Sequence, residues 1–313
     1  MTAYMDHKDL TNETIDAARA REIADNVHKV LDRIAAAEAA AGREAGSVRL
    51  LAATKTRDVG EIIAAIDAGV RMIGENRPQE VQVKAPGLVR LAAERGFALG
   101  VDDGASAASG VAGVASGVAS GTDGSASGSA GFAGSAGSAG SAGASQASPR
   151  NGVIPFHLIG QLQSNKIGKI LPFVDTIESV DSIDLAEKIA RRAVMRGITV
   201  GVLLEVNESG EASKSGCPAS HAIDLARRIG NMGGLELRGL MTIGAHVDDE
   251  TTIRSGFAHL RRTRDQILAS GAPGTEHCTE LSMGMTGDME LAIAEGATIV
   301  RVGTGIFGER AFI

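Results

Sequence analysis

The sequence predicts a single closed parallel α/β barrel of the TIM type, (β/α)8, with an extra N-terminal helix. Two observations carry this prediction. Eight short apolar runs alternate with longer amphipathic stretches along the 313 residues. The runs are also too apolar to expose one face to water, which is typical of parallel strands covered by helices. A strand–helix alternation repeated eight times indicates a barrel that closes on itself.

The order of the elements follows from these runs. An amphipathic helical stretch comes after each of the first seven. A doubly wound open sheet is the alternative fold, but it uses fewer strands and usually a glycine-rich first turn, and no glycine pattern follows the first run. The strand-like runs are residues 48–55, 71–76, 156–160, 175–180, 201–207, 237–243, 278–284 and 298–304.

The leading helix is predicted from about Asn12, because apolar residues then recur at spacings of three and four. Residues 1–12 are predicted to form a flexible tail, and residues 13–313 the barrel. Residues 101–151 consist almost entirely of Gly, Ala and Ser. That segment has no large side chains whose burial could offset its ordering entropy. We therefore predict a disordered insertion without chemistry of its own.

Composition excludes several classes of protein. The net charge of −7 argues against nucleic acid as a partner, because a nucleic-acid binder needs a basic face. No apolar stretch is long enough to span a membrane, and the polar N-terminus does not resemble a signal peptide. Cys217 and Cys278 lack metal-type spacing and are predicted to be reduced, structural thiols. We expect a cytoplasmic protein that binds neither nucleic acid, membrane nor metal.

Functional side chains of such barrels gather at the carboxyl ends of the strands. The first run ends in Lys55 and the second in Asn76, while the third carries His157 and the seventh Ser282. Small polar residues at nearly every strand end indicate a ligand site.

The last strand run leads into a glycine-containing turn, "VGTG" at residues 302–305. Backbone N–H groups without neighbouring Cβ atoms form anion-binding nests, and barrels often hold phosphate after strands seven and eight. Gly303 and Thr304 are thus candidate phosphate ligands, to which Ser282 can add a hydroxyl. The alternative is that the glycines only permit a tight turn.

Lys55 ends the run "LLAATKT" at residues 50–56. Taken alone, it fits a strand-end lysine whose amine stays in water. A phosphate-binding turn on the neighbouring strand and Arg301 within that strand change the interpretation. Pyridoxal phosphate offers an aldehyde for a lysine, a phosphate for the turn and a ring nitrogen for a polar partner. A phosphate enzyme without this cofactor, using Lys55 as an aldolase-like amine, is the alternative.

Seven motifs in order also resemble the pyridoxal phosphate homeostasis proteins, the YggS/PROSC family. The resemblance covers nearly all of the chain from about residue 20, except 101–151, and it departs from the family at Thr286, where serine is common. The motifs are "LLAATKT", "IGENRPQE", "FHLIGQLQSNK", "VNESGEASKSG", "LRGLMTI", "LSMGMTGDME" and "VRVGTGIFGER".

This resemblance implies a barrel like the N-terminal domain of alanine racemase, with pyridoxal 5′-phosphate as its cofactor. It implies that Lys55 carries the cofactor as an internal aldimine and that Arg301 faces the pyridine nitrogen. The remaining residues that it implies are Ser282, Gly303 and Thr304 for the phosphate, and Asn76 and His157 along the pocket.

A cofactor-binding protein is expected, not an efficient enzyme. A pyridoxal phosphate racemase needs a proton acceptor on each face of the ring, typically a lysine and a tyrosine. The single tyrosine here, Tyr4, falls in the predicted tail, and the chain ends nine residues after Thr304, so we expect no racemase-type β domain. Arg301 would also disfavour a protonated pyridine nitrogen, which strong carbanion chemistry requires.

The predicted function is therefore storage, buffering or delivery of pyridoxal phosphate by a monomer, with apo-enzymes as partners. The alternative is a weak amino-acid racemase that uses Lys55 and His157 as its two bases. Lys214 is predicted to be a solvated charge in a loop, and a role in cofactor transfer is the alternative.

Overall fold

The structure is a computed structural model that describes residues 8–101, 152–209, 215–244, 247 and 249–309. The chain divides into two units, residues 1–102 with 152–313 and residues 103–151. The second unit lies outside the described residues. The predictions for the 101–151 insertion, Tyr4 and Lys214 therefore also concern residues outside this part of the chain.

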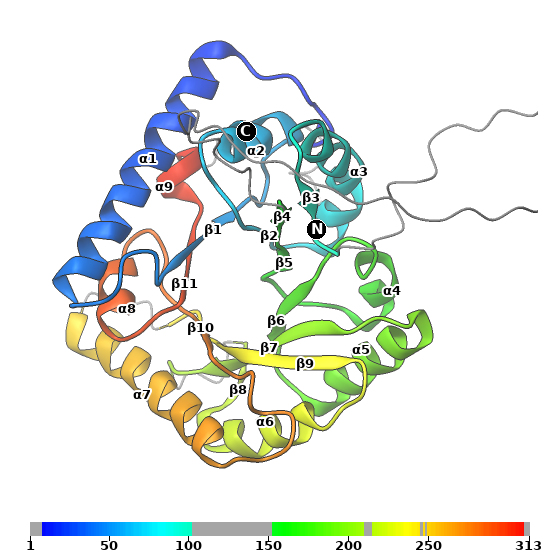
Figure 1. Ribbon diagram of the computed structural model, residues 1–313, viewed down its shortest axis with the longest axis vertical. Helices are drawn as coiled ribbons and strands as arrows, with labels where there is room; N and C mark the ends of the chain where they lie inside the picture. The colour runs from blue at the N-terminus through cyan, green and yellow to red at the C-terminus, as the bar shows by residue number, and fades with distance from the viewer. Residues whose placement is uncertain (1–7, 102–151, 210–214, 245–246, 248, 310–313) are drawn as a thin grey trace, which may run out of the picture. The chain divides into compact units, whose positions relative to one another are not determined.

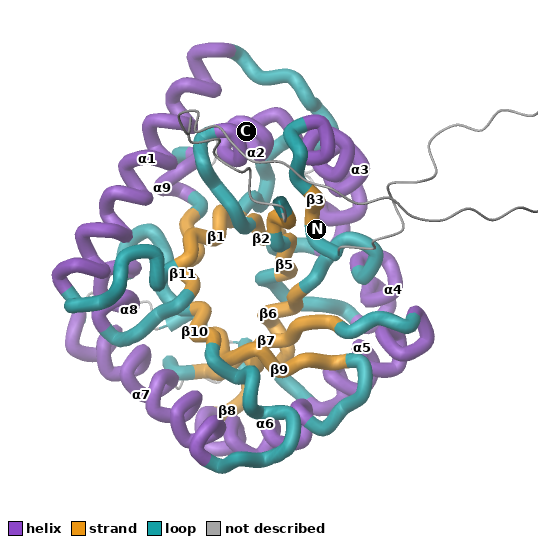
Figure 2. The backbone as a smooth tube through the Cα atoms, in the orientation of Figure 1, coloured by secondary structure: helices purple, strands orange, loops and turns teal. Residues whose placement is uncertain are grey.

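The first unit contains a closed barrel of eight parallel strands, which confirms the predicted fold. Neighbouring strands pair in the order β6-β5-β2-β1-β11-β10-β9-β7, and a β6–β7 pairing closes the ring. Figure 2 shows this ring of strands with the helices outside it. The strands are β1 (Arg49–Ala53), β2 (Ile73–Glu75), β5 (Phe156–Leu158), β6 (Thr176–Val180), β7 (Val200–Asn207), β9 (Leu235–Met241), β10 (Glu280–Ser282) and β11 (Ile299–Val302).

Helices surround the barrel, and the extra N-terminal helix α1 packs beside α2, α8 and α9 (Figure 1). Some of them start at side-chain caps: Asp16 accepts N–H bonds at the start of α1, and Asp58 forms a capping box with Glu61 at α2. The helices are α1 (Ala17–Ala40), α2 (Val59–Asp67), α3 (Pro78–Glu94), α4 (Ile167–Ile170), α5 (Ile183–Arg196), α6 (Ala222–Gly230), α7 (Glu250–Ala269), α8 (Met289–Ala294) and α9 (Thr304–Phe307).

Strand alternation divides the core into an outer and an inner part. On β11, Val300 and Val302 belong to the large apolar cluster of the molecule, whereas Ile299 packs with Leu51 and Met72 in a separate small cluster. Side chains two residues apart on a strand point to the same face. Arg301 therefore shares the inner face with Ile299, inside the barrel.

The N-terminal segment differs from the predicted tail. Residues 8–12 pack on the barrel: Leu10 is buried, its carbonyl accepts from Val59 N–H, and the carbonyl of Asn12 accepts from Gly60 N–H. Lys8 pairs with Glu61 at 2.6 Å. The helix starts at Ala17, not near Asn12, because Asp16 supplies the cap.

Three short strands and one helix add to the predicted elements. The strands β3 (Ala98–Leu99) and β4 (Val153–Ile154) pair with each other and come directly before and after the second unit in the sequence. The strand β8 (Cys217–Pro218) pairs with the end of β7, and α9 follows β11 directly. Two-residue strands lack the periodicity on which sequence prediction depends.

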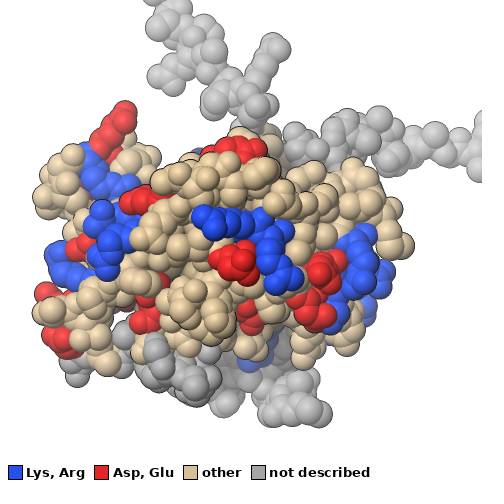
Figure 3. Space-filling model, turned by 90° about the horizontal axis from the view of Figure 1, so that it is seen from below, with Lys and Arg blue, Asp and Glu red and all other residues tan. Residues whose placement is uncertain are grey.

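Surface charges are mixed where they can be seen. Acidic and basic side chains alternate over the face shown in Figure 3, which carries no wide basic patch among its described residues. None of the helices in the described ranges is long and apolar enough to cross a membrane.

Candidate functional site

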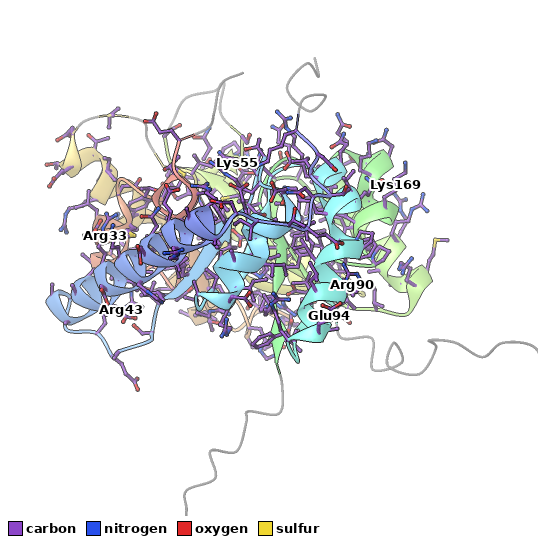
Figure 4. All side chains as sticks on the ribbon, turned by 90° about the horizontal axis from the view of Figure 1, so that it is seen from above. Arg33, Arg43, Lys55, Arg90, Glu94 and Lys169 are labelled. Carbon is purple, nitrogen blue, oxygen red and sulfur yellow. The ribbon has the colours of Figure 1, made fainter. Side chains whose placement is uncertain are left out.

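Lys55 lies just beyond the carboxyl end of β1, near one end of the barrel (Figure 4). Leu51 on the same strand belongs to the inner cluster, so the alternation along β1 assigns Ala53 and then Lys55 to the inner face. The backbone turns sharply after Lys55, because Thr56 has a positive φ of 64°. Lys55 thus lies at the mouth of the barrel.

The turn after β11 lies beside Lys55, because β1 and β11 are neighbours with Ala52 opposite Val302. A Cβ added to Gly303 would lie 3.3 Å from the carbonyl oxygen of Ala53. Farther along, Arg57 Nη2 donates to the carbonyl of Gly308 at 2.9 Å. The structure therefore brings together Lys55 and the predicted phosphate ligands Gly303 and Thr304.

Donors at this turn suit a phosphate. Gly303 and Thr304 use their backbone N–H groups in no hydrogen bond among the described residues. Thr304 Oγ1 donates to Thr286 Oγ1 at 3.1 Å, and Gly305 N–H donates to the same oxygen at 3.3 Å. A Cβ on Gly305 would lie 2.9 Å from Val302 Cγ1, so a larger residue there would displace a neighbouring side chain. Together, N–H and hydroxyl groups form the donor set that anions prefer.

Thr286 was missed as a site residue from sequence. It lies in the loop between β10 and α8, and only the folded barrel shows its hydroxyl against the turn. The available signal was the retained hydroxyl in "SMGMTGD".

The structure does not bring Ser282 to the turn. Ser282 pairs with Ile299 on β11, four residues before Gly303, a distance of about 13 Å along a strand. Its fully buried hydroxyl donates to Glu178 Oε2 at 2.6 Å and accepts from Arg301 Nη1 at 2.7 Å. Both partners of this hydroxyl lie inside the barrel, so the structure places Ser282 away from the turn where we predicted it.

A buried polar network continues from Ser282 across the barrel. Arg301 Nη2 donates to the carbonyl of Thr242 at 2.7 Å, and His157 Nδ1 lies 2.7 Å from Glu178 Oε1. Burial alone would raise the pKa of Glu178, but the hydrogen bond from His157 and the charge of Arg301 outweigh it and lower the pKa. Arg301 is thus held in one orientation, and His157 lies within this network.

A pocket of about 440 Å³ opens at the same end of the barrel. Asn76, at the end of β2, is among its lining residues, and its contact with a cofactor stays a prediction. Glu205 on β7 was not predicted, although it occupies the last inward position before Asn207. Burial and the nearby Asp181 raise the pKa of Glu205 to about 7, against a lowering by Arg301. The other lining residues are Arg77, Pro78, Gln79, Ile159, Gly160, Gln161, Gln163, Ser215 and Ile243.

Comparison with known proteins agrees with the motif resemblance. The family model described as alanine racemase, N-terminal domain, matches residues 30–311. The pyridoxal phosphate homeostasis protein of Vibrio cholerae is 32% identical, over 93% of this chain and 98% of its own length.

Two solved structures are also similar. The crystal structure of an unknown protein from Bifidobacterium adolescentis is 67% identical with a TM-score of 0.80, and the match covers 96% of this chain and 100% of that chain. PipY from Synechococcus elongatus, solved with PLP bound, is 28% identical with a TM-score of 0.58, covering 88% and 100%. The chain therefore belongs to the alanine racemase N-terminal domain family and, within it, to the pyridoxal phosphate homeostasis proteins.

Proposed function

We propose that this protein binds pyridoxal 5′-phosphate through a Schiff base with Lys55 and takes part in its homeostasis by storage, buffering or delivery, without robust catalysis. The observation that carries the proposal is the juxtaposition of Lys55 with the Gly303–Gly305 turn on adjacent strands. Relatives named for this homeostasis and a PLP-bound structure of PipY support it.

Each part of the site has a proposed role. The N–H groups of Gly303 and Thr304 and the hydroxyl of Thr286 would hold the phosphate. Arg301 would face the ring nitrogen, and Asn76 would line the entrance. When bound, the cofactor supplies an electrophilic aldehyde and an electron-withdrawing ring. Ser282 and His157 would act indirectly, because both hold the network that orients Arg301.

The residues of the barrel favour holding the cofactor over turnover. An arginine is a donor only, so Arg301 accepts no proton and does not favour a protonated ring nitrogen. No tyrosine occurs between residues 8 and 309, and His157 is committed to Glu178 at 2.7 Å. The tyrosine that a racemase uses as its second base is therefore missing from the part of the chain that the structure describes, and His157 is engaged elsewhere.

A weak racemase-like activity is the second candidate, and one observation favours it. Glu205 lines the pocket with a pKa raised to about 7, close to the value expected of a general acid or base at neutral pH. Lys55-dependent racemisation of an amino acid at rates typical of enzymes would favour this candidate and contradict the proposal. Loss of that activity in Glu205→Gln would identify the second base.

The proposal extends to partners and place of action. We propose delivery to apo-enzymes by a monomer in the cytoplasm, where Cys217 and Cys278, both free and buried, would stay reduced. Light scattering coupled to size-exclusion chromatography measures the molar mass in solution and so tests whether the protein is a monomer. Transfer to an apo-enzyme is tested by its recovery of activity from loaded protein in the presence of a scavenger of free aldehyde.

Binding at Lys55 is tested by colour. Protein mixed with pyridoxal phosphate should gain a near-visible absorbance band, and borohydride should fix the cofactor on the peptide that contains Lys55. Lys55→Ala should abolish both, whereas the exposed Lys169→Ala, labelled away from Lys55 in Figure 4, should change neither. Colour retained in Lys55→Ala would overturn the proposal.

A further inference from the structure

We propose that Glu75, Glu80 and Lys84 are positioning residues for Lys55, fixing the backbone on both sides of it so that its amine is presented to the cofactor. This inference rests on the proposed function, since it explains how the binding lysine is held. The three residues come from β2 and α3, which follow Lys55 in the chain.

Lys84 is the centre of this cluster. It is fully buried, and its Nζ donates to three oxygens: the carbonyl of Thr54 at 3.0 Å, Glu75 Oε1 at 2.7 Å and Glu80 Oε2 at 2.8 Å. All three hydrogens of the ammonium group are therefore used. One of them holds the residue that precedes Lys55.

The residues on either side of Lys55 are each held by a carboxylate of the cluster. Thr54 Oγ1 donates to Glu75 Oε1 at 2.6 Å. Thr56 N–H donates to Glu80 Oε2 at 2.7 Å. Because both flanking residues are fixed, the direction in which the Lys55 side chain leaves the backbone is fixed as well.

The turn at Thr56 needs such support. Among the described residues, Thr56 is the one non-glycine residue with a left-handed backbone, at a φ of 64°. A β-branched residue in that region is strained and persists only when its surroundings impose the conformation. Two hydrogen bonds hold the turn here: Arg57 N–H donates to the carbonyl of Thr54 at 3.0 Å, and Thr56 N–H donates to Glu80.

Stability alone does not explain the cluster. A buried lysine with two carboxylates loses hydration, and apolar residues of similar volume often stabilise a core equally well. Glu75 Oε2 and Glu80 Oε1 are buried without a hydrogen-bond partner among the described residues. Burial raises the pKa of Glu75 to about 7 despite the adjacent Lys84. Polar groups retained at this cost, directly behind Lys55, point to a role in the site.

Two conservative changes at Glu80 distinguish the effect of the position of its side-chain oxygen from the effect of its charge. Glu80→Gln keeps an oxygen at the distance of Thr56 N–H but removes the charge. Glu80→Asp keeps the charge but withdraws the oxygen by one methylene. We expect Gln to retain affinity for pyridoxal phosphate to within about threefold, and Asp to lose at least roughly tenfold, as for one lost charge-assisted hydrogen bond.

The matched control is Glu38→Ala. Glu38 is also buried, and its Oε1 accepts from Val48 N–H at 2.7 Å. Val48 directly precedes β1, at the end of the strand opposite Lys55. This variant should lower the unfolding temperature and leave cofactor affinity unchanged. A general loss of stability would instead weaken binding in the control as well.

Two readouts are independent of the cofactor. In apo-protein, Glu80→Asp should speed amide hydrogen exchange at Thr56 and change the rate at which Lys55 is acylated, and Glu80→Gln should change neither. If Glu80→Asp and Glu80→Gln showed the same exchange rate and the same affinity as each other, the positioning role would be overturned. Loss in Gln with retention in Asp would also overturn it, because charge would then be what matters.

Failure of the proposed function gives a different result. In that case wild-type protein would gain no colour with pyridoxal phosphate, while the exchange and acylation measurements would still decide whether Glu80 fixes the turn.

Discussion

Ser282 Oγ donates a hydrogen bond to Glu178 Oε2 at 2.6 Å across the inside of the barrel, between residues 104 positions apart in the chain. The same hydroxyl accepts from Arg301, so one serine joins a buried carboxylate to a buried guanidinium. Neighbouring buried charges are stabilising only when their remaining hydrogen-bonding groups are satisfied. Ser282 therefore belongs to the network that orients Arg301, and we propose Thr286 in its place as the hydroxyl of the phosphate site.

Ser282→Ala should lower stability more than it lowers phosphate recognition. It leaves Glu178 Oε2 without its donor, at a cost of about 1–3 kcal/mol in the free energy of unfolding. Urea denaturation measures this loss. Affinities for pyridoxal phosphate and for pyridoxal, which lacks the phosphate, should change by the same factor. A selective loss for the phosphorylated form would return Ser282 to the phosphate site.

Thr286→Val should have the opposite effect. It replaces the hydroxyl beside Gly305 N–H by a methyl group of similar size and buries no new charge. We expect affinity for pyridoxal phosphate to fall about tenfold, and affinity for pyridoxal to stay unchanged, as a hydrogen bond to a charged group is lost. Absorbance titration of both ligands measures the ratio. Thr286→Ser is the control and should bind as the wild type does.

Arg301 and Glu178 should be energetically coupled. Both charges are buried and are joined through Ser282, so removing one leaves the other less compensated, at a cost of about 1–3 kcal/mol in the free energy of unfolding. Arg301→Met and Glu178→Gln should each destabilise the protein, and the double variant should cost less than the sum of the two. A double-mutant cycle from urea denaturation measures the coupling. Additive effects would show that Ser282 and Thr242, not Glu178, compensate the charge of Arg301.

The strands and the strand-end residues could be predicted from sequence because both are local signals. Apolar runs bounded by helical periodicity marked all eight barrel strands, and the positions of Lys55 and Gly303 after two of them suggested these residues for the site. The hydrogen bonds of the site could not be predicted in the same way. Which oxygen Ser282 or Thr56 meets depends on which strands closure of the barrel makes neighbours.

The segment before α1 shows the same limit. Nothing periodic marks residues 8–12, so the sequence predicted a tail. Leu10 is buried because two backbone hydrogen bonds fasten this segment to the start of α2, a contact between segments about fifty residues apart. The motif resemblance named Ser282 for the phosphate, and only the folded structure shows that the Thr286 hydroxyl, not that of Ser282, lies at the turn.

The two cysteines should be unreactive in the folded protein. Cys217 and Cys278 are buried, and burial is the main cause that raises the pKa of both thiols to about 12. Because the thiolate is the nucleophile, alkylation by iodoacetamide at pH 8 should be slow in native protein and fast in urea. Mass spectrometry of timed samples measures both. Rapid labelling of native protein would show that one of these segments opens readily.

Stability should fall as pH rises from about 4.5 to 7, and Glu205 should be one cause. Its folded pKa of about 7 exceeds the ordinary value of 4.5, so between these values the folded protein binds more protons than the unfolded chain. The stabilisation is complete below the lower value and is lost as pH passes the higher one. Glu205→Gln should remove this loss and raise the free energy of unfolding at pH 8 by up to about 3 kcal/mol relative to wild type.

Glu61 provides a control of opposite sign. Burial would raise its pKa, but hydrogen bonds from Lys8 and Arg19 outweigh burial and lower it. Its contribution to stability is therefore present above about pH 4.5 and is lost as the pH falls below that value. Glu61→Gln should destabilise at pH 7 and leave the decline between pH 4.5 and 7 intact, whereas Glu205→Gln should flatten it. An unchanged decline in Glu205→Gln would mean that another group, such as Glu75 with its raised pKa, carries the proton.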